Sequence, residues 1–184
     1  MSILEPHYAG IPPDQLPSIE RNPIHVVLDN FRSAFNVGSA FRTSDAGAVE
    51  HLYLCGLCAH PPNPKLEKTA LGAFDYVDWT YHHTTAEALE SLRGQGIPIV
   101  AVENTNDAVV YTEFAWPTPV ALVLGHEVEG IDPQVLQLCH HQVSIPVLGY
   151  KRTINVATAY GVILFEILRQ WGRLAPPVPE NDGR

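Results

Sequence analysis

Three segments of the sequence combine glycine with polar side chains that can bind a ligand or help to move a proton. The first, residues 29–46, contains Asn36 and, six residues later, Arg42. An amide and a guanidinium placed together can orient a hydroxyl or a phosphate group through several donors. A helix cap at Asn36, followed by a solvated or ion-paired Arg42, explains the same residues.

The second segment, residues 121–132, is an apolar run that leads directly into Gly125, followed by Glu127 and Gly130. A glycine at this point lets a ligand approach the backbone closely. The carboxylate of Glu127 could bind a polar ligand group or receive an arginine side chain of a partner. An ordinary turn with Gly130 at positive φ is the alternative. The pattern matches neither GxGxxG nor the P-loop, which disfavours a dinucleotide or a nucleoside triphosphate.

The third segment, residues 144–166, places Thr153 and Asn155 where a long helix starts. The first N–H groups of a helix lack partners within the helix and can bind an anionic or carbonyl-bearing ligand. Ala157, Ala159 and Gly161 keep the first turns small. Close packing against another helix explains these small residues as well as a ligand does.

Elements of two kinds must position these segments. We expect strands in the apolar runs Ile24–Leu28, His51–Leu54, Tyr76–Trp79, Ile97–Val102, Val120–Leu124 and Gln142–Ile145. We expect helices at Val37–Gly47, Thr84–Arg93, Pro133–Cys139 and Thr153–Trp171. Such alternation predicts an α/β fold, with a mainly parallel sheet and helices on both faces. Because ligands bind at the carboxyl ends of parallel strands, the three segments should form one site.

The length of 184 residues suits a single domain, which we assign to residues 23–174, between an N-terminal arm (1–22) and a flexible tail (175–184). Three cysteines, Cys55, Cys58 and Cys139, are too few for a disulfide framework and favour a reducing, cytoplasmic compartment. The first residues lack the pattern of a secretory leader, and no apolar run has membrane-spanning length, so we expect no membrane association. The histidines and the single Cys55-x-x-Cys58 pair lack the ligand spacing of a metal site.

The net charge is less favourable to a nucleic-acid partner. The chain has 11 Lys and Arg but 20 Asp and Glu, which gives a net charge of −9. Proteins that hold nucleic acid by its phosphates usually have a basic face. Several cations nevertheless lie in or near the three segments. We expect a local basic patch built from Arg32, Lys65, Lys68, Lys151 and Arg152.

Taken together, the segments resemble the three motifs of the SpoU (TrmH-like) family of RNA 2′-O-ribose methyltransferases, within the SPOUT superfamily, over roughly residues 23–172. The first resembles N-x-G-x-x-x-R-T, through Asn36 and Arg42, and the second G-x-E-x-x-G, through Gly125, Glu127 and Gly130. The third resembles the Ile-Pro motif of the family through Ile145, Pro146, Gly149, Asn155 and Val156. Each motif alone is weak, but three in this order are specific.

The resemblance implies a C-terminal deep trefoil knot, a rare exception to unknotted topology. It implies that S-adenosylmethionine binds within the knot, held by Val102, Glu103, Leu124, Gly125, Ile145, Leu148, Thr153 and Ile154. It further implies a tRNA or rRNA substrate and a homodimer with the site near the subunit interface. The RNA-binding extension that many relatives carry is not expected in this chain. The expected helix Thr153–Trp171 has an apolar surface wider than one stripe, part of which could bury a second subunit.

The resemblance also implies catalytic roles for Arg42, Asn36, Glu127, Thr153 and Asn155. Arg42 would orient the ribose hydroxyl and a phosphate, with base action left open, because arginine normally stays protonated. Asn36 would position Arg42 or the ribose, Glu127 would hold an arginine, and Asn155 would order the catalytic loop. Thr153 stands where the family usually has serine, and its extra methyl group restricts the hydroxyl.

Two other functions remain open at this point. One is a non-catalytic RNA-binding module that keeps the knotted fold, favoured by the acidic balance and by Thr153. The other is a nicotinamide-dependent α/β enzyme, which the missing GxGxxG after the first strand disfavours.

Overall fold

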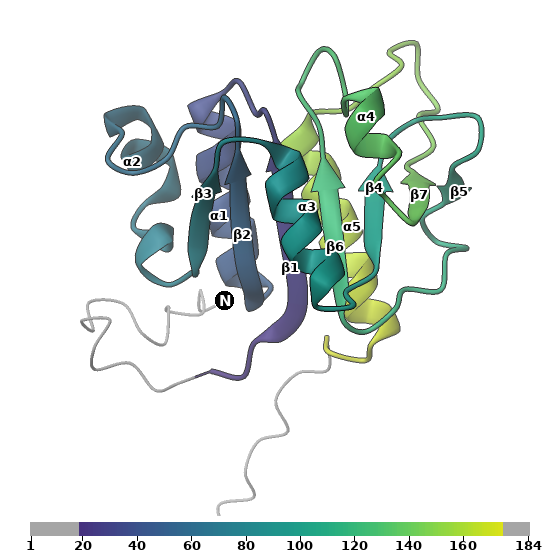
Figure 1. Cartoon of the computed structure of the whole chain (residues 1–184), viewed down its shortest axis with the longest axis horizontal. Helices are drawn as coiled ribbons and strands as arrows, with labels where there is room; N and C mark the ends of the chain where they lie inside the picture. Colours follow the sequence, from purple (N-terminus) through teal and green to yellow (C-terminus); the bar gives the residue numbers. More distant parts are fainter. Residues whose placement is uncertain (1–18, 175–184) are drawn as a thin grey trace, which may run out of the picture.

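The computed structural model describes residues 19–174 (Figure 1). Its strands are β1 (Asn22–Asp29), β2 (Val49–Cys55), β3 (Trp79–His82), β4 (Ile99–Val102), β5 (Val109–Val110), β6 (Val120–Leu124) and β7 (His141–Ser144). Its helices are α1 (Ala34–Ala46), α2 (Pro64–Ala70), the 3₁₀ turn η2 (Ala73–Asp75), α3 (Thr85–Gly94), α4 (Pro133–Leu136) and α5 (Val156–Gln170). The predicted tail and residues 1–18 of the predicted arm lie outside the described residues, and Asn22 already belongs to β1.

The seven strands form one sheet in the order β3-β2-β1-β6-β4-β7-β5, and each pair of neighbours is parallel. This confirms the predicted parallel sheet. The chain first builds outward from β1 to β3 and then continues on the other side of β1. The order therefore reverses between β1 and β6, where parallel sheets of this kind usually bind ligands.

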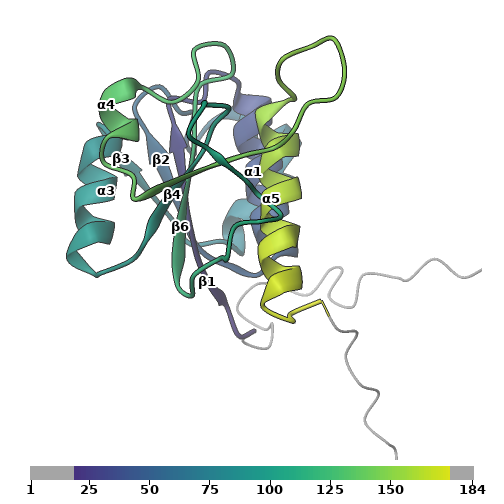
Figure 2. The same cartoon turned by 90° about the vertical axis from the view of Figure 1, so that its right-hand side faces the viewer.

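Helices cover both faces of the sheet, as predicted (Figure 2). In β1, Ile24, Val26 and Leu28 belong to the core beneath α1 and α5, whereas Val27 belongs to the core beneath α3. This alternation follows from the two-residue period of a strand, and burial of both faces explains the nearly continuous apolar runs. Among the described helices, none is both long and apolar enough to cross a membrane.

Two elements differ from the sequence prediction on the β3 side of the sheet. The strand predicted at Tyr76–Trp79 lies instead at Trp79–His82, where Trp79 pairs with Leu52. Because β3 is an edge strand with exposed polar residues, its sequence lacks the apolar run that marks the central strands. The helix α2 was not predicted, although Asn63 as its N-cap and Pro64 as its first residue are typical of a helix start.

The two helices that carry site residues begin at other positions than predicted. α1 begins at Ala34 with Ser33 as its N-cap, so Asn36 lies in its first turn and is not the cap that we expected. α5 begins at Val156 with Asn155 as its N-cap, rather than at Thr153. The side-chain amide of Asn36 is therefore available for other contacts.

The apolar surface of α5 is also less available than expected. Tyr160, Ile163, Leu164, Ile167 and Leu168 are buried within the chain itself. Phe165, which is 42% exposed, is the large apolar side chain that α5 leaves open. The width of the apolar surface therefore does not by itself indicate a second subunit.

Candidate functional site

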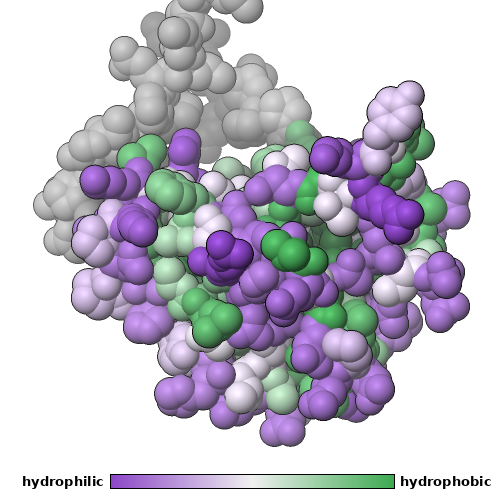
Figure 3. All heavy atoms as spheres, turned by 90° about the horizontal axis from the view of Figure 1, so that it is seen from above, coloured by the Kyte–Doolittle hydropathy of each residue, from purple (hydrophilic) through white to green (hydrophobic). Residues whose placement is uncertain are grey.

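A cavity of about 190 Å³ opens at the carboxyl ends of β4, β6 and β7. Figure 3 views this edge of the sheet from above. The loop after β6 and the segment that leads into α5 form most of its wall. The lining residues are Val102, Glu103, Asn104, Leu124, Gly125, His126, Glu127, Val128, Glu129, Gly130, Ile145, Val147, Thr153, Ile154, Val156 and Ala159.

The structure brings together seven of the eight residues expected to bind the cofactor. Those that line the cavity are Val102, Glu103, Leu124, Gly125, Ile145, Thr153 and Ile154. Leu148 is the exception, because its side chain is 97% exposed in the loop between β7 and α5. Its neighbour Val147 lines the cavity in its place.

The carboxylate of Glu127 joins the loop after β6 to the start of α1. It accepts hydrogen bonds from the backbone N–H groups of Arg32 and Ser33, both at 2.9 Å, and from Nδ2 of Asn36 at 2.7 Å. Burial alone would raise the pKa of Glu127, but these donors outweigh it and lower the pKa. Within the described chain, Glu127 thus binds main-chain groups and an asparagine, and its contact with an arginine of a partner stays a prediction.

Asn36 connects Glu127 to the third segment. Its Oδ1 accepts a hydrogen bond of 3.1 Å from Nδ2 of Asn155. Oδ1 of Asn155 in turn accepts from the N–H groups of Ala157 and Thr158 and caps α5. All three sequence segments therefore meet through Glu127, Asn36 and Asn155 at the rim of one cavity.

Two further carboxylates hold the far end of the loop after β6. Glu103 accepts from the N–H of Ile131 at 2.9 Å. Asp29, which is only 2% exposed, accepts from the N–H of Asp132 at 3.3 Å and from the Thr85 hydroxyl. Sequence reasoning did not single out Asp29. A charged residue at the end of an apolar strand was the available signal.

Gly125 is required by the packing of the loop itself. A Cβ at this position would lie 2.3 Å from both the carbonyl carbon of Gly130 and the nitrogen of Ile131. Gly130 has a φ of 74°, as the turn interpretation predicts. The packing of the loop thus accounts for Gly125, and close approach of a ligand to its backbone stays a prediction.

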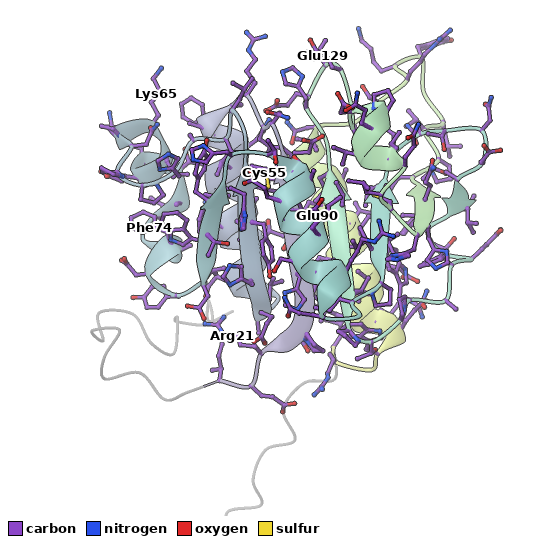
Figure 4. The ribbon with its side chains drawn as sticks, in the orientation of Figure 1. Arg21, Cys55, Lys65, Phe74, Glu90 and Glu129 are labelled. Atoms are coloured by element: carbon purple, nitrogen blue, oxygen red, sulfur yellow. The ribbon has the colours of Figure 1, made fainter. Side chains whose placement is uncertain are left out.

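Arg42 is exposed on α1 and does not line the cavity. The cations expected to bind RNA are also exposed, and they lie in loops and on α2: Arg32, Lys65, Lys68, Lys151 and Arg152. Figure 4 shows that Lys65 and Glu129 both point outward at the carboxyl edge. Over residues 19–174, no group of three or more His, Cys, Asp or Glu side chains could hold a metal ion.

The sequence pattern of the SpoU rRNA Methylase family matches residues 23–165. The tRNA (guanosine(18)-2′-O)-methyltransferase of Escherichia coli is 29% identical over 148 residues, which cover 79% of this chain and 62% of the relative. The 23S rRNA (guanosine-2′-O-)-methyltransferase RlmB of Photorhabdus laumondii is 32% identical over 158 residues, covering 86% and 64%. The chain thus spans less than two thirds of the length of these two relatives.

Solved structures show the same fold. The SpoU methyltransferase AviRb of Streptomyces viridochromogenes, in complex with AdoMet, matches with a TM-score of 0.75 at 26% identity, covering 86% of this chain and 64% of AviRb. A second solved structure, which concerns the 2-OH methylation of C/U34 on tRNA, matches with a TM-score of 0.73 at 29% identity. In that case the match covers 82% of this chain and 99% of the other.

Proposed function

Because the chain belongs to the SpoU rRNA Methylase family, we propose that it transfers a methyl group from S-adenosylmethionine to a ribose 2′-hydroxyl of structured RNA. The observation that carries this proposal is the hydrogen-bonded connection of Glu127, Asn36 and Asn155 at the rim of the cavity. These contacts unite three segments far apart in the sequence. The relatives quoted above act on tRNA or on rRNA, and either remains our proposed substrate class.

The lining of the cavity fits the proposed cofactor. Val102, Leu124 and Ile145 offer an apolar surface that suits a flat adenine ring. Glu127 places negative charge near a cofactor that carries a positive sulfonium. When bound, S-adenosylmethionine would supply the methyl group that the reaction transfers.

The chain itself would align the ribose hydroxyl and help its proton to leave. Thr153 lines the cavity, so its hydroxyl is placed to contact the bound molecules. Glu127 is a poor base, because three donors hold its carboxylate and its pKa is lowered. We therefore assign Glu127, Asn36 and Asn155 to positioning the two loops. Arg42 would orient the hydroxyl and an adjacent RNA phosphate.

A homodimer would complete this site. Arg42 lies outside the cavity lining of its own chain, on an exposed part of α1. α1 packs against α5, and Phe35 and Phe165 on these helices are 58% and 42% exposed. We propose that a second copy covers this surface and brings Arg42 next to a reacting ribose.

We further propose that the chain threads a C-terminal trefoil knot. Support comes from the pairing of β5 with β7 and from the hydrogen bond between the Trp116 N–H and Gln170. These contacts hold the segment before β6 against the segments that follow it.

The proposed RNA substrate also favours a cytoplasmic location.

In vitro transfer of a labelled methyl group from S-adenosylmethionine to unfractionated tRNA and rRNA tests the function. Mapping of 2′-O-methylation in cells with and without the protein identifies the nucleotide. We expect one or a few ribose positions to lose their methyl group when the protein is absent. Cofactor binding without any transfer would instead favour a non-catalytic RNA-binding module, and absence of cofactor binding would refute the methyltransferase.

A further inference from the structure

A group of exposed rings lies at the same edge of the sheet as the cavity, beyond β2 and β3. His60, Tyr81 and His83 form this group, which we call the aromatic platform. The ring centroids of His60 and Tyr81 are 4.6 Å apart, and those of Tyr81 and His83 are 5.5 Å apart. Tyr81 is 36% exposed, and both histidines are exposed. The proposed mechanism uses none of these three side chains.

Hydrogen bonds connect the platform to the first site segment. The Tyr81 hydroxyl donates to the carbonyl of Gly56 at 2.9 Å, which fixes the ring against the loop after β2. In that loop, the N–H of Leu57 donates to Oδ1 of Asn30 at 3.0 Å. Asn30 lies two residues before Arg32, whose N–H is held by Glu127. The platform is thus attached to the rim of the cavity through a short, hydrogen-bonded loop.

The separation and the charges suit an extended ligand that spans both places. β3 lies three strand positions from β6, which corresponds to about 14 Å at the usual spacing of neighbouring strands. Two exposed cations lie along this edge of the sheet. Arg32 follows β1, between the platform and the cavity, and Lys65 lies on α2, five residues after His60. The negative charge of Glu87 offsets these cations. It lies beside the platform, since the Glu87 carboxylate accepts a hydrogen bond from the backbone N–H of His83. Phosphate contacts alone would therefore hold RNA weakly here.

We propose that the aromatic platform stacks an unpaired base of the RNA substrate, close to the nucleotide whose ribose enters the cavity. The inference rests on the proposed function. Aromatic rings bind bases by stacking with little dependence on sequence, and imidazole nitrogens can add hydrogen bonds to base edges. Recognition of this kind needs single-stranded or splayed nucleotides, because bases within an A-form helix are not accessible to rings. The substrate class is thus RNA with an unpaired loop or bulge at the methylated position.

The test compares Tyr81→Ala with Tyr81→Phe, which keeps the ring and removes the hydroxyl. A labelled single-stranded RNA oligonucleotide of mixed sequence and unfractionated tRNA serve as probes. We expect Tyr81→Ala to weaken binding of the oligonucleotide about tenfold, the effect of one lost stack. The KM for tRNA should rise to a similar degree, whereas Tyr81→Phe should stay within about twofold of the parent protein. Val109→Ala, an exposed apolar residue on β5 at the opposite sheet edge, is the matched control and should change neither value.

The outcomes separate the platform from the methyltransferase proposal. If the parent protein neither binds S-adenosylmethionine nor methylates RNA, the proposed function fails. If it does both and Tyr81→Ala binds the oligonucleotide as tightly as the parent, the platform alone is refuted. Should Tyr81→Ala unfold, the double variant His60→Ala/His83→Ala removes two exposed rings and is judged by the same two values.

Discussion

At the scale of single residues, the carboxylate of Glu127 is the point where the site is held together. Its three donors come from the start of α1, and Asn36 extends the connection to Asn155. A carboxylate that accepts several hydrogen bonds is stabilised in its ionised form, which agrees with the lowered pKa of Glu127. Such a group positions its neighbours well and accepts a proton poorly.

Replacing Glu127 by glutamine tests this role. The glutamine amide keeps the shape of the carboxylate. Its NH₂ group, however, would face an N–H group that now donates a hydrogen bond to Glu127. We expect the free energy of unfolding to fall by about 1–2 kcal/mol, and methyl transfer to fall at least tenfold. Urea denaturation and initial rates measure the two effects. Glu90→Gln, on the exposed surface of α3, is the control and should leave both unchanged.

Arg42 provides a contrasting prediction. Arg42→Ala should lower turnover by a factor on the order of 10², the scale for losing a group that positions charge or a proton. Cofactor affinity should stay the same, because Arg42 does not line the cavity. Arg42→Lys keeps the charge but not the two-pronged geometry and should recover only part of the turnover. Unchanged turnover in Arg42→Ala would remove Arg42 from the mechanism.

The site residues show what sequence can and cannot predict. Asn36, Glu127 and Asn155 were found because their types and spacing resemble a known set of motifs. Their partners were not found, since hydrogen bonds between residues about 90 to 120 positions apart depend on the folded arrangement. Asp29 was missed for the same reason. The aromatic platform was missed because His60 and Tyr81 come together only when β2 and β3 pair.

At the scale of elements, the loop after β6 is shaped by its own backbone and by flanking carboxylates. Gly125 packs against the backbone of Gly130 and Ile131, and Glu103 and Asp29 hold the loop end through main-chain N–H groups. The positions of the central strands were predictable because buried parallel strands are apolar throughout. The edge strand β3 and the short helix α2 were not, because exposed elements carry no such pattern.

Two glycines allow this packing to be tested with matched substitutions. Gly125→Ala would place a methyl group 2.3 Å from fixed backbone atoms, so the loop must shift. We expect the variant to lose about 1–3 kcal/mol of stability and to bind S-adenosylmethionine at least tenfold more weakly. Gly149→Ala meets nothing within 4 Å and should retain the stability of the parent. Thermal denaturation and calorimetry measure the difference, and equal behaviour of both variants would contradict this account.

At the scale of the whole molecule, a partly buried imidazole should make stability depend on pH. Burial, followed by the nearby His51, lowers the pKa of His25 from 6.5 to about 4. The unfolded chain then binds this proton more readily, so stability falls as the pH drops from about 6.5 toward 4. We expect a loss of about 1–2 kcal/mol after allowance for solvent at this partly exposed group. His25→Asn should reduce the difference between urea midpoints at pH 7 and pH 4.5, and an unchanged difference would exclude His25 as its source.

Assembly is the remaining property of the whole molecule. The proposed dimer covers the part of α1 and α5 that carries Phe35, Arg42 and Phe165, all of them exposed in the single chain. Light scattering at micromolar concentration should give about twice the chain mass of 20.3 kDa. Phe165→Asp would place a charge in an apolar contact, which is costly without a partner. This variant should be monomeric and lose methyl transfer, because Arg42 no longer reaches a ribose in the other copy.

The matched control for this prediction is Val109→Asp. It introduces the same charge at another exposed apolar position, on β5 at the edge of the sheet. This variant should remain a dimer with unchanged transfer. A parent protein that has the mass of one chain at all micromolar concentrations, yet methylates RNA, would refute the dimer. It would then require Arg42 to act within its own chain, through a movement of α1 toward the cavity.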